Sequence, residues 1–140
     1  MKVSDVTIDD EYVTVNGEAS ILEVAKTIAK SGIPDVVVID NEERVLGALD
    51  DYDIVSKVVA EGQDPNKIKA KDIMFAPPPI KLDTELEAAH EIMEELKVTV
   101  LPVVGEGRKL MGVLTIMDVL EGKTQENDEK GNFLTRILGL

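Results

Sequence analysis

The hydrophobic residues in the first half of the chain follow two spacings in a fixed order. Apolar residues three or four positions apart, such as Ile21, Val24 and Ile28, predict a helix with one buried face. The β-branched run at residues 36–39 is typical of a strand covered on both faces. The predicted order is strand, helix, strand, strand and helix, at residues 12–15, 20–30, 35–39, 45–49 and 50–60.

The second half repeats this order at an offset of 65 residues, which relates Gly47 to Gly112 and Asp53 to Asp118. Each copy alone would leave an apolar face exposed to water, so we expect the two copies to pack together. The matching segments are predicted at residues 79–82, 85–96, 100–104, 110–114 and 115–121.

Polar side chains mark the ends of the predicted helices. Ser20 and Glu23 form a possible capping box before the first helix, and Gly32 supplies its end. Thr84 and Glu87 form a candidate capping box for the matching helix of the second half.

The composition changes after Glu121, where a polar stretch without an apolar anchor predicts a mobile segment. Beyond this stretch, Asn132 is a candidate cap for a short helix whose apolar side carries Phe133, Leu134, Ile137 and Leu138. The predicted division of the chain is repeat one at 1–61, repeat two at 62–121 with a linker at 61–71, and a flexible tail with an apolar helix at 122–140.

Composition and charge exclude several classes of protein. The chain has 140 residues and 44% hydrophobic residues, enough for a buried core, and it lacks an apolar run that could span a membrane or serve as a signal peptide. We therefore expect a cytoplasmic protein without a membrane partner. The absence of cysteine excludes disulfides, and the single histidine, His90, excludes a multi-histidine zinc site. A net charge of −13 repels a phosphate backbone, so nucleic acid is not an expected partner.

The most informative stretch is residues 112–118, where a strand turns into a helix. The first N–H groups of a helix have no helical acceptor, and the helix dipole favours negative charge there. Thr115 adds a hydroxyl, and Asp118 adds a carboxylate suited to the two hydroxyls of a ribose. This combination fits a nucleotide, although the same two residues also form an ordinary helix cap. The recurrence of glycine and aspartate at Gly47 and Asp53 favours a ligand site.

This duplicated unit, with its glycine, threonine and aspartate in the second copy, resembles the CBS domain family. Residues 72–74, 31–33 and 101–104 resemble further stretches of the family. The resemblance covers residues 1–121 and implies an α/β (α+β) fold, in which two tandem β-α-β-β-α repeats pack with pseudo-twofold symmetry into one Bateman module. Members bind adenosyl ligands such as AMP, ATP or S-adenosylmethionine between the repeats. They regulate an attached or partner protein and do not usually catalyse a reaction.

The resemblance also implies a role for individual residues. Thr115 would contact phosphate and Asp118 the ribose hydroxyls, while main-chain groups near Ile80 and Val100 would bind the edge of the base. Lys81, Arg108 and Lys109 are the nearest cations for a phosphate, although each could equally be a solvated loop charge. The implied ligand-binding residues are Met74, Ile80, Lys81, Val100, Pro102, Gly112, Thr115 and Asp118.

The first copy differs at one position, because Asp50 occupies the place of Thr115. A carboxylate there would repel a phosphate. We therefore expect the second cleft, formed by Thr14, Asp35, Asp50 and Asp53, to be empty or to take a neutral or cationic ligand. The three carboxylates at 50–53 also suit Mg²⁺ or Ca²⁺. However, acids at a helix N-terminus are stabilised without a metal, so we predict neither a metal site nor a catalytic cofactor.

Two functions from different classes follow. The first is a regulatory module, not an enzyme, that senses AMP, ADP or ATP between its repeats and acts on a protein partner or on the mate in a homodimer. The second is a ligand-free structural or oligomerisation module that acts through its dimer surface and its C-terminal tail. A module that binds S-adenosylmethionine or a metal ion is a further alternative. An enzyme with metal-dependent chemistry at Asp50 and Asp53 is the weakest alternative. His90 lies at the edge of a helical apolar stripe and is expected at the surface or in a subunit interface.

Overall fold

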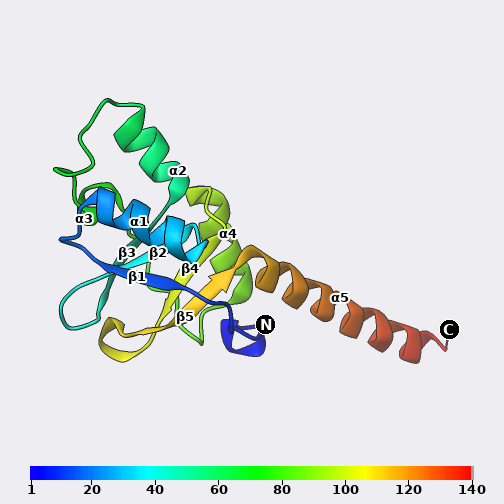
Figure 1. Ribbon diagram of the computed structural model, residues 1–140. Coiled ribbons are helices and arrows are strands. Elements are labelled where there is room, and N and C mark those ends of the chain that lie inside the picture. The colour runs from blue at the N-terminus through cyan, green and yellow to red at the C-terminus, as the bar shows by residue number, and fades with distance from the viewer. Residues whose placement is uncertain (140) are drawn as a thin grey trace.

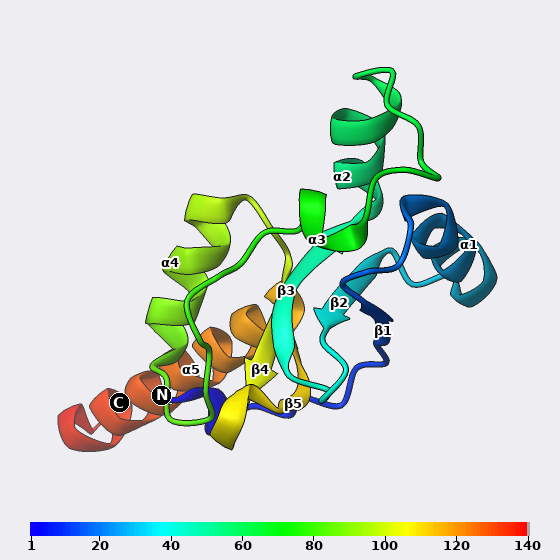
Figure 2. The same cartoon turned by 90° about the vertical axis from the view of Figure 1, so that its left-hand side faces the viewer.

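A computed structural model describes residues 1–139, with all side chains except that of Phe133. Two small sheets lie between helices α1 and α4, and helix α5 projects away from the body (Figures 1 and 2). The elements are η1 (Val3–Asp5), β1 (Val13–Asn16), α1 (Ile21–Ser31), β2 (Asp35–Ile39), β3 (Val45–Asp50), α2 (Asp51–Ile54), η2 (Val55–Val59), α3 (Ala70–Ile73), α4 (Leu86–Leu96), β4 (Val100–Val104), η3 (Glu106–Arg108), β5 (Leu110–Thr115) and α5 (Ile116–Leu138).

The two sheets confirm the predicted mixed α/β repeats, but they are unequal. In the first sheet β1 pairs with β2 in parallel and β2 pairs with β3 in antiparallel orientation. In the second sheet β4 and β5 are antiparallel, and the counterpart of β1 is reduced to a single bridge between Ile80 and Val103. The three prolines at 77–79 explain this difference, because proline has no N–H to donate to a strand ladder.

Each repeat has its own hydrophobic core, and a third cluster joins the two. The core of repeat one surrounds Val24 and Val36, and that of repeat two surrounds Met93 and Leu101. Between them, Val37 and Val45 of the first sheet pack against Val104 and Val113 of the second. The two sheets therefore meet through side chains from β2, β3, β4 and β5.

The segment that precedes each repeat packs against the other repeat. Val3, near the N-terminus, is buried in the core of repeat two, whereas Ala70 and Ile73 of α3 are buried in the core of repeat one. Two backbone hydrogen bonds hold these segments in place. The N–H of Val3 donates to the carbonyl oxygen of Thr84 at 2.9 Å, and the N–H of Ala70 donates to that of Ala19 at 2.8 Å. Each core is therefore completed by the other half of the chain.

At the N-terminus of α1 the structure confirms the serine half of the predicted capping box, without the reciprocal bond from the Glu23 side chain, whereas the box predicted for α4 is absent. The N–H of Glu23 donates to Ser20 Oγ at 3.2 Å, and Gly32 ends the helix with φ of 73°. The capping box predicted at Thr84 and Glu87 is wrong, because Thr84 Oγ1 instead accepts from the N–H of Lys81 at 2.9 Å. The N–H of Leu86, the first residue of α4, donates to the carbonyl oxygen of Met1.

Helix α5 corrects the prediction of an irregular segment after Glu121. The helix continues from Ile116 to Leu138, so Asn132 lies inside it rather than at a cap, and Gly139 ends it with φ of 70°. The polar stretch contains glutamate, lysine and glutamine, which have good helix propensity, and its first turn packs on α4 through Gly122 and Lys123. Leu140 and the side chain of Phe133, both part of the predicted apolar end, lie outside the described residues.

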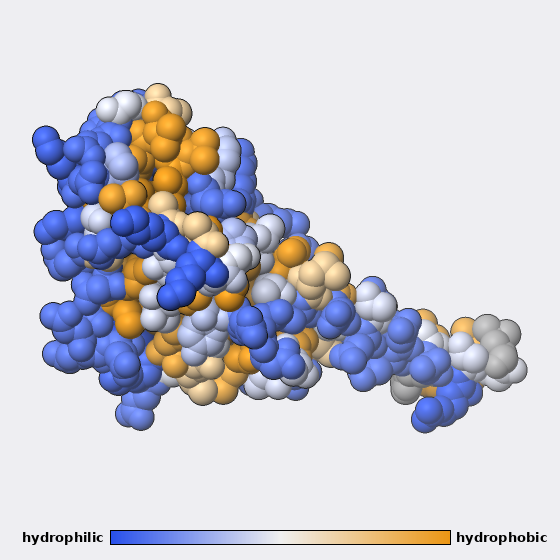
Figure 3. Space-filling model, in the orientation of Figure 1, coloured by the Kyte–Doolittle hydropathy of each residue, from blue (hydrophilic) through white to orange (hydrophobic). Residues whose placement is uncertain are grey.

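Exposed apolar side chains gather over α2 and the beginning of α5 (Figure 3). They include Tyr52, Val55 and Val59 from α2 and η2, and Met117 and Leu120 from α5. The repeat offset relates Tyr52 to Met117 and Val55 to Leu120, so this surface uses matching positions of the two repeats. Within residues 1–139, the model contains no helix with the length and hydrophobicity needed to cross a membrane.

Candidate functional site

The turn between β5 and α5 forms a reciprocal cap. The N–H of Asp118 donates to Thr115 Oγ1 at 3.2 Å, and the N–H of Thr115 donates to Asp118 Oδ2 at 2.9 Å. The cap uses the hydroxyl of Thr115 only as an acceptor and only one oxygen of Asp118. The hydroxyl proton of Thr115 and the second carboxylate oxygen of Asp118 take no part in the cap. Both could therefore bind a ligand while the cap stays intact.

The matching turn of repeat one has the same cap but a different neighbour. Asp50 and Asp53 exchange hydrogen bonds of 2.9 and 3.0 Å. Asp53 Oδ1 also lies 3.1 Å from Lys57 Nζ, which balances its charge. The repeat offset places Gly122 where Lys57 stands, so Asp118 lacks the equivalent lysine.

A cavity of about 150 Å³ lies beside Thr115, and both repeats contribute to its wall. The aliphatic residues of its wall are buried or half-buried, whereas Asp10, Glu11 and Tyr12 are exposed, so its interior is apolar and its opening is polar. The residues that line it are Asp10, Glu11, Tyr12, Ile33, Asp35, Val36, Val37, Ala48, Leu49, Phe75, Val100, Pro102, Val113 and Thr115.

The structure gathers some of the predicted binding residues at this cavity. Thr115, Val100 and Pro102 line it, whereas Asp118, the predicted partner of Thr115, is not one of its lining residues. Asp35, a predicted residue of the other cleft, lines the same cavity. Thr14 lies in a separate hollow next to Lys109.

Other predicted residues lie elsewhere. Ile80 is buried in the core of repeat two and lines a small cleft on the far side of Pro102. The side chain of Met74 packs against repeat one near Gly47, whereas Gly112 is buried against Ile8. Lys81 is exposed and does not line the cavity.

Sequence reasoning missed the contribution of the N-terminal segment. Asp10, Glu11 and Tyr12 lie at the cavity because the chain crosses β5 before it enters β1, and Phe75 joins them from the segment after α3. Two of the four aromatic residues of the chain, Tyr12 and Phe75, therefore line this one cavity. Because the chain has so few aromatic residues, Tyr12 and Phe75 could have been singled out from the sequence as candidates for a ligand site.

Carboxylates dominate the electrostatics of the opening. Burial, together with the smaller effect of the charges on Asp50, Asp51 and Asp53, raises the pKa of Asp35 to about 6. Burial and the facing carboxyl of Asp118 also raise the pKa of Asp10. These shifts indicate that negative charge is unfavourable around the cavity.

The expected cations lie outside this cavity. None of the described residues that line it is lysine or arginine. The ammonium group of Lys109 donates to the carbonyl oxygen of Glu42 at 2.6 Å, and Arg108 lines the cleft of Ile80. Among residues 1–139, no group of three or more His, Asp or Glu side chains is arranged to hold a metal ion.

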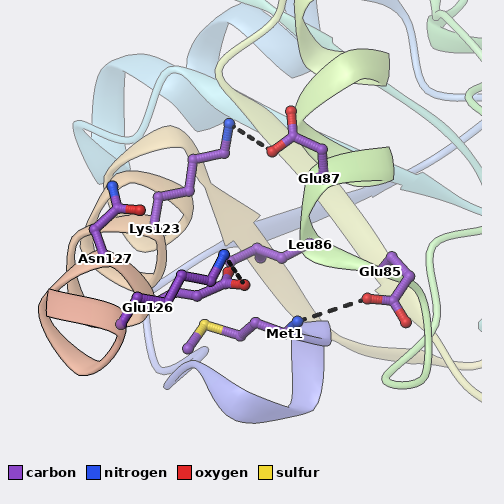
Figure 4. A pocket seen from close by; sticks show the side chains of 8 residues that line it. Met1, Glu85, Leu86, Glu87, Lys123, Glu126 and Asn127 are labelled. Carbon is purple, nitrogen blue, oxygen red and sulfur yellow. Dashed lines mark ion pairs between the residues drawn. The ribbon is translucent and has the colours of Figure 1, made fainter. Parts of the chain in front are cut away.

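A larger groove of about 400 Å³ lies between α4, α5 and the N-terminus (Figure 4). Its charged groups already pair with one another, with Lys123 Nζ 2.8 Å from Glu87 and the Met1 amine 3.6 Å from Glu85. His90, predicted at the edge of the α4 stripe, is half-buried beside this groove, with Nδ1 2.6 Å from Lys123 Nζ. These contacts fasten α5 to α4, so the smaller apolar cavity is the better candidate site.

Comparisons with known proteins identify the repeated unit. The CBS domain model matches residues 3–60 and 70–123. Uncharacterized protein MK0525 of Methanopyrus kandleri is 30% identical over 112 residues, which cover 79% of this chain and 57% of that protein. The chain therefore spans little more than half the length of this relative.

Solved structures share the architecture. CBS domain protein PAE2072 from Pyrobaculum aerophilum, complexed with AMP, has a TM-score of 0.71 and 25% identity, covering 84% of this chain and 89% of that one. The CBS domain pair of protein MJ0100, in complex with 5′-methylthioadenosine and S-adenosyl-L-methionine, has a TM-score of 0.71 and 23% identity, covering 90% and 98%. The chain therefore belongs to the CBS domain family and folds as a pair of CBS repeats, a Bateman module.

Proposed function

We propose that this chain is a regulatory module that binds an adenosyl ligand in the cavity between its two CBS repeats. The observation that carries the proposal is the cavity itself, whose apolar wall and polar opening come from both repeats and include the capped turn at Thr115. The AMP complex of the Pyrobaculum aerophilum protein supports the choice of ligand class.

The base would lie against the apolar wall. Val100, Pro102 and Val113 offer flat aliphatic surface, and Tyr12 and Phe75 offer aromatic faces. The ribose would lie at the capped turn, where the hydroxyl of Thr115 can donate and the second oxygen of Asp118 can accept. This placement assigns Thr115 and Asp118 to the sugar.

Binding would act on the relative position of the repeats. The lining residues come from β2 and β3 of repeat one and from β4 and β5 of repeat two, so a bound ligand contacts both sheets. A ligand that fits one relative orientation better than another shifts the population toward it. We propose that an attached or partner protein senses this shift, and that the module itself does not catalyse a reaction.

The exposed surface at Tyr52, Val55, Met117 and Leu120 is the proposed homodimer interface. These side chains are between 45% and 71% exposed, although all four are large and apolar. Exposed apolar patches of this kind mark interaction sites. Its use of matching positions in the two repeats suits an interface between two copies.

A second candidate function, a ligand-free interaction module, is favoured by the outer half of α5. Leu134, Ile137 and Leu138 are exposed there, and the helix projects beyond the body of the module (Figure 1). Truncation after Lys123 separates the candidates, because it keeps the Lys123 contacts with α4. Loss of partner binding with ligand affinity retained would favour the interaction module.

Isothermal titration calorimetry with adenosine compounds tests the proposed function. We expect saturable binding with one site in each chain and at least about tenfold weaker binding for Thr115→Ala. Ser20→Ala is the matched control, because the hydroxyl of Ser20 likewise accepts from the third N–H of its helix, but Ser20 does not line the cavity. Equal affinity of Thr115→Ala and the unaltered chain would contradict the proposal.

A further inference from the structure

The opening of the cavity carries negative charge on more than one side. Asp10 and Glu11 belong to the N-terminal segment, and Asp35 begins β2. Asp118 does not line the cavity, but it caps the same turn as the lining residue Thr115, and its charge helps to raise the pKa of Asp10. Together these groups surround the turn where a nucleotide phosphate was expected.

Nearby cations do not offset these charges. The described lining residues include no basic side chain. Lys109 lies in the adjoining hollow beyond Tyr12, where its ammonium group is bound to the carbonyl oxygen of Glu42. Lys57, which neutralises Asp53 in repeat one, has no counterpart beside Asp118 because Gly122 occupies that position.

The size of the cavity decides which part of a ligand meets the charged opening. Its volume of about 150 Å³ is below the range of about 300–1,000 Å³ typical of pockets that enclose a drug-sized ligand. The apolar interior therefore suits the base, and the 5′ substituent of the ribose has to lie outside, among the carboxylates.

Building on the proposed function, we propose that this site selects an adenosine ligand whose 5′ substituent carries no phosphate and is neutral or positively charged. Like charges at short range raise the cost of binding an anion, particularly next to an apolar wall that excludes water. A thioether is neutral and avoids this electrostatic cost. A sulfonium is positively charged, so the same carboxylates attract it.

Calorimetry with three probes tests this selection. 5′-Methylthioadenosine is the neutral probe, S-adenosylmethionine the cationic probe and AMP the anionic probe. We expect AMP to bind at least about tenfold more weakly than 5′-methylthioadenosine at low salt, and this difference to shrink at high salt because screening weakens the repulsion. Tighter binding of S-adenosylmethionine than of 5′-methylthioadenosine at low salt would identify the cation as preferred, whereas equal binding would show that absence of phosphate is sufficient.

Asp10→Asn tests the cause, with Asp9→Asn as the matched control. Both substitutions remove one charge from the same segment, but Asp9 does not line the cavity. We expect Asp10→Asn to reduce the ratio of the AMP to the 5′-methylthioadenosine dissociation constant by about three- to tenfold, and Asp9→Asn to change it by less than about twofold.

The possible failures can be told apart. Binding of AMP as tight as, or tighter than, that of 5′-methylthioadenosine would overturn the selection and leave the proposed adenosyl site intact. The selection would also be overturned if Asp9→Asn changed the ratio of the two dissociation constants as much as Asp10→Asn does. The effect would then come from the overall charge of the protein. No binding of any adenosine compound would overturn the proposed function and this inference with it.

Discussion

Asp35 and Asp50 are direct partners in the antiparallel register of β2 and β3. The register places two carboxylates on neighbouring strands, and Asp35 is half-buried at the cavity wall. Like charges directly opposite each other destabilise a sheet. The pKa of Asp35, about 6, reflects burial first and then the neighbouring carboxylates.

Asp35→Asn is predicted to stabilise the protein at pH 7.5 and to have no effect near pH 3. The pKa of Asp35 is higher in the folded than in the unfolded protein, so the charge costs stability above pH 6, and this cost disappears as the pH falls through 6 toward 4. Because the side chain is half-exposed, we expect about 1 kcal/mol at pH 7.5 after allowing for solvent screening.

Urea denaturation at several pH values measures this difference. Asp83→Asn removes a charge from an exposed turn and serves as the control. A pH-independent gain for Asp35→Asn, or an equal gain for Asp83→Asn, would show that the buried charge is not the cause.

Two threonine substitutions separate capping from binding at the α5 turn. Thr115→Ala removes the cap acceptor and is expected to lower the free energy of unfolding by about 1 kcal/mol, as Ser20→Ala should at α1. Thr115→Ser keeps the hydroxyl and should retain both stability and ligand binding. Thermal unfolding with and without 5′-methylthioadenosine measures both effects, and a ligand-induced shift in Tm that survives in Thr115→Ala would exclude a role for the hydroxyl in binding.

Much of the fold could be predicted from sequence because local patterns specify it. The apolar periodicity around Val24 predicts α1, and Ser20 and Gly32 mark its ends, which the structure confirms. The failure at Thr84 has a tertiary cause, because the residues around Met1 satisfy the start of α4. The outer part of α5 shows the converse case, in which good helix formers such as Glu129 and Lys130 continue a helix where its residues are exposed.

Only part of the candidate site could be predicted from the sequence. The spacing of Thr115 and Asp118 reveals their shared cap, because both lie on one turn of one helix. By contrast, Asp10 reaches the same place from the N-terminal segment, which crosses to the other repeat. No local pattern predicts that exchange, so the acidic character of the opening became evident only from the structure.

Gly47→Ala is predicted to destabilise the module strongly, by about 2 kcal/mol or more. A Cβ atom at this position would lie 2.3 Å from the carbonyl oxygen of Phe75, whose backbone is held to Ala48 by two hydrogen bonds of 2.9 Å. The clash would displace Phe75 from the cavity wall. Chemical denaturation with intrinsic fluorescence or circular dichroism measures the loss.

Gly105→Ala is the matched control for this substitution. Its Cβ would meet the Sδ atom of Met111 at 2.7 Å, but Met111 is exposed and flexible, so the side chain can move away. We expect a loss below about 1 kcal/mol. Equal losses at Gly47 and Gly105 would contradict the assignment of a rigid backbone contact at Gly47.

Val55→Glu is predicted to dissociate the proposed homodimer, because it places a charge in an apolar interface. Leu120→Glu should have the same effect, since the repeat offset relates the two positions. Leu134→Glu, on the outer half of α5, is the control. Sedimentation equilibrium gives the association constants, and a monomeric unaltered chain at all concentrations would refute the interface.

A crystal structure of the complex with 5′-methylthioadenosine tests most directly whether an adenosine ligand occupies the cavity between the two CBS repeats. We predict the purine against Val100, Pro102 and Val113, with a ribose hydroxyl within hydrogen-bonding distance of Asp118. A ligand bound instead in the groove between α4 and α5, or at the Asp50 turn of repeat one, would contradict the account.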